Sequence, residues 1–199
     1  TVGALMLYEQ GKLLMDDPLS KYFPKFANSV VAVRDANGQF TTDTVPAVRK
    51  ITIQDLMRHT SGLVYGGRGN SVVHKMYPDG SAAAAVEFDG AGFMDKLASL
   101  PLLYQPATVW DYGFGLDVLG QVIEPTAKQP LGDYLKTNLF TPLGMSDTGF
   151  YVPPEKASRY AKPLPADPDS GKPQSRMPEL TQRLKFECGG GCAESTASD

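Results

Sequence analysis

The sequence is poor in the residues and patterns that mark several classes of protein. Its 199 residues include two histidines and two cysteines, whereas a structural zinc site uses four such ligands at characteristic spacings, so we expect no metal site. The formal net charge is −3, and no basic stretch suited to nucleic acid is present. No apolar run approaches the roughly 18 residues that a membrane-spanning helix needs. We therefore expect neither nucleic-acid binding nor a membrane span.

The two cysteines, Cys188 and Cys192, enclose three glycines in a Cys-Gly-Gly-Gly-Cys segment. This spacing permits a tight disulfide, but a single pair does not define the redox environment of a protein. We favour two free thiols over a disulfide. The compartment stays open between the bacterial cytoplasm and the periplasm.

Glycine and proline, with 20 and 16 residues, are abundant and predict many loops and short elements. Thr52 and Asp55 resemble the capping box that begins a helix. A turn signal at residues 35–38 separates two β-rich stretches and predicts a small hairpin. The expected elements are helices at 2–9, 52–58, 88–100, 116–124, 131–140 and 154–160, a short turn at 18–23, a hairpin joining 30–34 to 39–45, a surface excursion at 64–86 and an extended polar loop at 162–178.

These elements predict an α+β chain that is mainly helical. No run of strong strands is present to make a central sheet, and we expect that a large hydrophobic core is hard to assemble from these parts. Residues 1–9 read as the middle of a helix, and residues 195–199 read as the beginning of another. We therefore expect a chain that is truncated at both ends.

Four stretches occur in the order expected of one family. The most specific are His-Thr-Ser-Gly-Leu at 59–63 and Pro-Leu-Gly-Met-Ser-Asp-Thr at 142–148. The stretches at 3–22, 51–63, 110–124 and 139–150 together cover nearly the whole chain. In this combination the sequence resembles class C β-lactamases and the related family VIII carboxylesterases, within the serine β-lactamase and penicillin-binding-protein superfamily.

The resemblance implies a fold and a domain organisation. Residues 1–199 would form a partial β-lactamase-like domain, namely the mainly helical portion of that fold with the central antiparallel sheet largely missing. The family places a Ser-x-x-Lys motif at the head of a buried helix, but no serine of this sequence is followed by lysine three residues later. No Lys-Thr-Gly or His-Gly-Gly element occurs either. The nucleophilic serine and its lysine are therefore expected outside this chain.

Tyr112 matches the family's third motif, a tyrosine followed by a small residue and then often asparagine. A serine hydroxyl is a weak nucleophile that needs a base, and a nearby lysine cation lowers the pKa of a tyrosine from its usual value near 10. The resemblance implies that Tyr112 is the base or proton relay, although an ordinary packed tyrosine is the alternative. Phe114 replaces the asparagine and favours an esterase with an apolar acyl pocket. Trp110 would line the substrate site or pack in the core.

His59 and Ser61 do not form a catalytic pair in this interpretation. Two positions on one short turn cannot aim both groups at a shared carbonyl, so Thr60 and Ser61 are expected to satisfy backbone groups at a helix end. His74 is expected at the surface of the glycine-rich excursion. The run Gly189–Gly191 resembles the approach to a helix in the family and is not expected to bind phosphate.

The expected function is that of a serine hydrolase, most simply a carboxylesterase that acts through an acyl-enzyme on a small ester and needs no cofactor. A β-lactamase or D-amino-acid peptidase, with a lactam or peptide substrate, is the alternative within the family. A non-catalytic relative that binds a peptide or a protein partner is the alternative of another class. A chain that is only half of a domain would also self-associate or pair with a missing segment.

Overall fold

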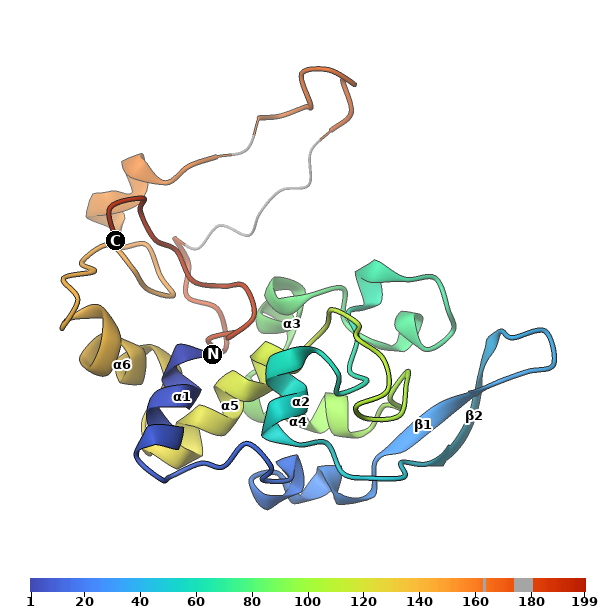
Figure 1. The fold of residues 1–199 in the computed structure, drawn as a ribbon. Helices are drawn as coiled ribbons and strands as arrows, with labels where there is room; N and C mark the ends of the chain where they lie inside the picture. Colours follow the sequence, from blue (N-terminus) through green and yellow to red (C-terminus); the bar gives the residue numbers. More distant parts are fainter. Residues whose placement is uncertain (163, 174–180) are drawn as a thin grey trace.

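The structure is a computed structural model that describes residues 1–162, 164–173 and 181–199. Most of the chain forms a helical body, from which a two-stranded hairpin and residues 164–173 project in different directions (Figure 1). The helices are α1 (Val2–Glu9), α2 (Ile53–Arg58), α3 (Ser81–Glu87), α4 (Gly90–Ala98), α5 (Gly115–Ala127) and α6 (Leu131–Leu135). Short 3₁₀ turns are η1 (Leu19–Lys21), η2 (Pro24–Asn28), η3 (Gly66–Arg68), η4 (His74–Met76) and η6 (Pro154–Arg159), and η5 (Lys136–Phe140) is a π-helical turn.

The hairpin confirms the turn signal in the sequence. Strand β1 (Val30–Arg34) pairs antiparallel with β2 (Phe40–Pro46), and the register shifts between Ala32 and Arg34. The Asp35 carboxylate accepts hydrogen bonds from the backbone N–H groups of Asn37 and Gln39, and Gly38 has a φ of 79°. Among the described residues these are the two strands of the one sheet, so the mainly helical α+β expectation is confirmed.

Helix α5 is the centre of the helical body, and α1, α2, α4 and α6 all pack against it. Its buried face includes Val118, Leu119, Val122 and Ile123, which follow the i, i+1, i+4, i+5 spacing of one helix face. Pro125 lies in its last turns, and the helix ends at Lys128 in the left-handed conformation. Buried apolar residues from α1 through residue 192 form one cluster around this helix. The expectation that a large core is hard to assemble is therefore wrong, because many short elements converge on a single helix.

Two further expectations need correction. The stretch 64–86 is not a surface excursion throughout, because Val64, Val73, Tyr77 and Ala84 are buried and α3 lies within it. Gly66 allows two backbone segments of this stretch to lie close together, since a Cβ on Gly66 would collide with the carbonyl oxygen of Tyr77. The expected helix at 131–140 is two pieces, α6 and the π-helical η5.

The C-terminal region is irregular where it is described. Residues 162 and 164–173 contain no helix, as expected for an extended loop, while the rest of that predicted loop, at 163 and 174–178, lies outside the described residues. Cys188 and Cys192 are fully buried and joined by a disulfide. The preference for free thiols is therefore wrong, because the two buried side chains, four positions apart in sequence, are bonded to each other. None of the described helices has the length and apolar character of a membrane span.

Helix α2 begins with the capping box that the sequence indicates. The Thr52 hydroxyl accepts a hydrogen bond from the Asp55 N–H, and the Asp55 carboxylate accepts one from the Thr52 N–H. The same carboxylate accepts hydrogen bonds from Arg49 at 2.6 Å and from the Thr60 hydroxyl at 3.0 Å. Burial alone would raise the pKa of Asp55, but the bonds from Arg49 and Thr52 outweigh it and hold that pKa below its usual value.

Replacing Asp55 with asparagine is expected to lower the free energy of unfolding at pH 7 by about 1–3 kcal/mol, because a buried charged acceptor with several donors is lost. The lowered pKa makes this contribution complete above the unfolded-state value near pH 4 and removes it as the pH falls further. The difference between D55N and the parent should therefore shrink at pH 3, as measured by urea unfolding. The exposed neighbour in the same helix supplies the control, since Q54A should change stability by less than about 0.5 kcal/mol. Equal stability of D55N and the parent at pH 7 would refute this assignment.

Candidate active site around Tyr112

Tyr112 lies in the loop that leads into α5, and His59 holds this loop from both sides. The backbone N–H of Asp111 donates to the His59 carbonyl oxygen at 2.9 Å. The backbone N–H of Gly113 donates to His59 Nδ1 at 3.5 Å. The residues before and after Tyr112 are therefore both bonded to one residue at the end of α2.

Glycines allow this loop to lie directly against α2 and the segment that follows it. A Cβ on Gly113 would collide with the carbonyl oxygen of Leu63, and a Cβ on Gly115 would collide with that of Leu56. The small residue that follows Tyr112 is therefore a steric requirement of this structure. A side chain there would push Tyr112 away from the segment around Leu63.

The phenol ring of Tyr112 is surrounded by other rings and a cation. The His59 ring centroid lies 4.6 Å from the Tyr112 centroid, and Tyr65 makes an edge contact at 5.5 Å. The Arg68 guanidinium lies 5.2 Å from the same centroid. Trp110 is 65% exposed and touches the other components through the His59 ring, at 6.2 Å between centroids. We call His59, Tyr65, Arg68, Trp110 and Tyr112 the Tyr112 cluster.

Phe114 does not belong to the Tyr112 cluster, although it is two residues away in sequence. Its side chain has no exposed area and contacts Tyr65 at 4.5 Å and Phe93 at 5.3 Å between ring centroids. The structure therefore brings Trp110 and Tyr112 together and turns Phe114 into the core.

Several neighbours of Tyr112 were not assigned from the sequence. His59 lies in the His-Thr-Ser-Gly-Leu motif, which is evident in the sequence. The signal that could have linked His59 to Tyr112 is the order in which their two motifs follow each other along the chain. Tyr65 and Arg68 carry no motif of their own. Ser61 is buried and its hydroxyl oxygen accepts a hydrogen bond from the Leu63 N–H, which confirms a structural role for that serine.

Burial shifts the pKa values of Asp111, beside the cluster, and of His59, within it. Burial raises the pKa of Asp111, while the positive charges of His74 and Arg68 oppose the rise. Burial also lowers the pKa of His59, which favours the neutral imidazole. His74 is partly buried, and its Nδ1 lies 2.7 Å from the Ser71 hydroxyl. Within the described ranges, no group of three His, Cys, Asp or Glu side chains is arranged to hold a metal ion.

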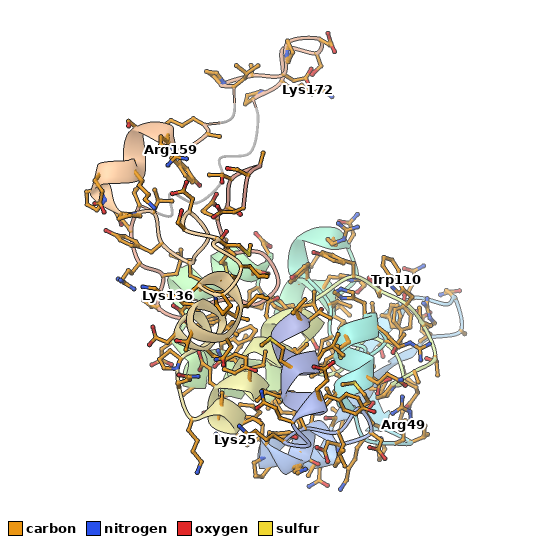
Figure 2. All side chains as sticks on the ribbon, turned by 60° about the vertical axis from the view of Figure 1, so that its left-hand side comes forward. Lys25, Arg49, Trp110, Lys136, Arg159 and Lys172 are labelled. Atoms are coloured by element: carbon orange, nitrogen blue, oxygen red, sulfur yellow. A yellow bond between two sulfur atoms is a disulfide. The ribbon has the colours of Figure 1, made fainter. Side chains whose placement is uncertain are left out.

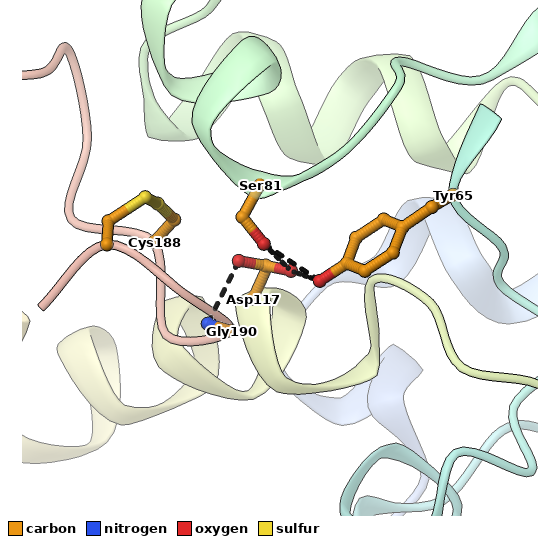
Figure 3. Close-up of a disulfide and its surroundings, with 6 residues drawn as sticks. Tyr65, Ser81, Asp117, Cys188 and Gly190 are labelled. Carbon is orange, nitrogen blue, oxygen red and sulfur yellow. Dashed lines mark hydrogen bonds between the residues drawn. A yellow bond between two sulfur atoms is a disulfide. The ribbon is translucent and has the colours of Figure 1, made fainter. Parts of the chain in front are cut away.

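A buried carboxylate, that of Asp117, binds Tyr65 of the Tyr112 cluster (Figure 3). Asp117 on α5 is fully buried and accepts hydrogen bonds from the Tyr65 hydroxyl at 2.9 Å, the Ser81 hydroxyl at 2.9 Å and the Gly190 N–H at 3.0 Å. Burial raises the pKa of Asp117, and these three donors counteract the rise. The carboxylate thus ties Tyr65 to α3 and to the loop closed by the disulfide.

The glycine run 189–191 is explained by the same contact. A Cβ on Gly190 would collide with the Asp117 carboxylate, and a Cβ on Gly189 would collide with the Leu116 carbonyl oxygen. The backbone of this loop is therefore pressed against the first turn of α5. The three glycines therefore allow close packing of the loop against α5. The expectation that they do not bind phosphate stays a prediction.

Two of the hollows formed by the described residues lie outside the Tyr112 cluster. The larger, about 760 Å³, is lined by residues from α6 to the C-terminal segment, including Lys136, Arg159 and Glu194. Figure 2 shows Trp110 well apart from Lys136 and Arg159. The smaller, about 310 Å³, lies between the start of α1 and α5 and is lined by Thr1 and Leu116 among others.

The fold and the order of these elements define a class of protein, and comparison with known proteins identifies it. The family model described as Beta-lactamase matches residues 1–199. The chain therefore belongs to the β-lactamase family, and the resemblance drawn from its motifs is confirmed.

The relatives include esterases. The chain is 34% identical over its whole length to Protein Rv1367c of Mycobacterium tuberculosis, covering 49% of that protein. Over 81% of its length it is 35% identical to Esterase EstB of Burkholderia gladioli, covering 38% of EstB. Among solved structures, Simvastatin Synthase (LovD) from Aspergillus terreus superposes over 98% of this chain and 47% of its own, with a TM-score of 0.72 and 26% identity. The chain thus spans about half the length, or less, of the relatives it matches.

Asp117 offers a test of the support behind the cluster. Replacing it with alanine leaves three buried donors without an acceptor, so the free energy of unfolding should fall by at least about 2 kcal/mol. Asparagine keeps an acceptor for Gly190 and can donate to a hydroxyl oxygen, so D117N should stay within about 1 kcal/mol of the parent. Thermal and urea unfolding measure both variants. A D117A protein as stable as D117N would contradict the proposed support.

Proposed function

We propose that this chain forms the helical part of a serine acyl hydrolase, with carboxylic esters as substrates and Tyr112 as the proton relay of an acyl-enzyme mechanism. The observation that carries the proposal is the enclosure of Tyr112 by the Tyr112 cluster within a chain of the β-lactamase family. The backbone on both sides of Tyr112 is hydrogen-bonded to His59, and only glycine fits at position 113. These contacts fix the position of Tyr112, as a proton relay requires. The 1–199 partial domain, with the sheet and the nucleophile supplied by other residues, is part of this proposal.

The packing of α1 against α5 supports a position for the missing nucleophile. Thr1 and Gly3 of α1 line one hollow together with Leu116 and Ile123 of α5, and α5 is the helix that follows the Tyr112 loop. The Ser-x-x-Lys motif would occupy a helical turn before Thr1, next to this packing.

The chemistry of such a site follows from its components. The lysine and Tyr112 would accept the serine proton as the hydroxyl attacks the carbonyl carbon, and would return a proton to the departing alcohol. Water would then attack the acyl-enzyme with the proton transfers repeated. Two backbone N–H groups would stabilise the oxyanion.

We propose different roles for Tyr112, Trp110 and Phe114, the three residues identified from the sequence. Trp110 is the exposed member of the Tyr112 cluster and is proposed to form a wall of the substrate site. Phe114 has no exposed area, so we propose that it supports the site through packing and not through contact with the acyl group. An ester is preferred over a lactam because EstB, to which the chain is 35% identical, carries the name of an esterase.

Tyr112 is tested in the longest natural polypeptide that contains these 199 residues. Y112F should lower kcat for p-nitrophenyl butyrate by about 10²–10⁴-fold with little change in KM, because proton transfer is lost while binding is kept. W110A should act mainly on KM. Tyr104, a partly buried tyrosine that packs on Phe40, supplies the control, since Y104F should leave kcat unchanged.

The outcome also separates the alternatives. An unchanged kcat in Y112F would remove Tyr112 from the mechanism. Faster hydrolysis of the chromogenic cephalosporin nitrocefin than of the ester would favour a β-lactamase. Hydrolysis of neither, with saturable binding of a cell-wall peptide, would favour the non-catalytic relative.

A further inference from the structure

We infer that His59 is a positioning residue whose imidazole fixes Tyr112 in its working orientation, an inference that rests on the proposed function of Tyr112. From the sequence, the motif that contains His59 was expected to stabilise the end of a helix. The contacts of His59 indicate a more specific role, which is to hold the Tyr112 side chain in place.

Three contacts made by His59 converge on Tyr112. Its carbonyl oxygen accepts from the Asp111 N–H at 2.9 Å, and its Nδ1 accepts from the Gly113 N–H. Its ring lies over the Tyr112 ring at 4.6 Å with an angle of 37° between the planes. The first two contacts fix the backbone on either side of Tyr112, and the third limits rotation of the phenol.

The backbone of His59 adopts a conformation in which the side chain is not required for folding. His59 ends α2 with φ 55° and ψ 38°, in the left-handed region where glycine is the usual residue. Three residues later the chain does use glycine, at Gly62 with φ 82°. A non-glycine residue in the left-handed region is uncommon, and such residues cluster at functional sites. The imidazole supplies what glycine would lack, an acceptor and a ring beside Tyr112.

Two substitutions separate the side chain from the backbone conformation. In H59G the left-handed conformation becomes easier, so folding is kept while the acceptor and ring are lost. In H59N the side-chain oxygen replaces Nδ1 as an acceptor, and asparagine tolerates the left-handed region. K128G is the matched control, because Lys128 ends α5 with φ 58° and lies outside the Tyr112 cluster.

The kinetic test uses ester hydrolysis by the longest natural polypeptide. H59G should lower kcat by about 10–100-fold with KM nearly unchanged, since small displacements of a reacting group have effects of this size. H59N should recover most of the loss, and K128G should match the parent. In a Y112F background H59G should cause no further loss, because the group that it positions is gone. A full-sized effect of H59G in Y112F, or none in the parent, would overturn the inference.

A spectroscopic test does not depend on activity. With 3-fluorotyrosine at position 112, the ¹⁹F resonance should move when the His59 ring is removed in H59G, and K128G should leave it in place. An unmoved resonance in H59G would overturn the positioning role even if Tyr112 is catalytic. A moved resonance together with full activity in Y112F would keep the positioning role and reject the proposed function of Tyr112.

Discussion

The buried carboxylate of Asp117 is the interaction on which the arrangement of the helical body depends. It lies in the first turn of α5 and accepts hydrogen bonds from Tyr65, Ser81 and Gly190, which come from three distant parts of the chain. A carboxylate with no exposed area is unfavourable unless such donors surround it. The three segments therefore have to meet at α5, and the disulfide at Cys188 and Cys192 closes the loop that brings the third donor.

The candidate site is built outward from this contact. Tyr65 bonds to Asp117 through its hydroxyl and touches the Tyr112 ring with its edge. On the other side His59, at the end of the capped helix α2, binds the backbone on both sides of Tyr112. Two helices, α2 and α5, thus hold one partly exposed loop, which is the arrangement expected when a loop side chain must keep a fixed orientation.

The sequence predicted the features that depend on neighbouring residues. The capping box at Thr52 and Asp55, the turn before Gly38 and the apolar face of α5 are local patterns, and each is present in the structure. The family motifs identified the fold class, and they predict functional roles for Tyr112 and Trp110. The burial of Phe114 and the converging core were missed because they depend on which distant segments meet at α5. The disulfide joins residues four positions apart, and the Cys-Gly-Gly-Gly-Cys spacing permits both a bond and two free thiols. His59 was interpreted as structural because its bonds reach residues more than 50 positions away, beyond any local pattern.

The central claim is that these 199 residues supply the supporting half of a serine hydrolase site and not its nucleophile. Intact mass spectrometry after treatment with a fluorophosphonate ester tests it most directly. The account predicts that the 21.5 kDa chain gains no mass, and that the longest natural polypeptide gains one phosphonyl group on a Ser-x-x-Lys serine before residue 1. An adduct on a serine within residues 1–199, or no adduct on the longer polypeptide, would contradict it.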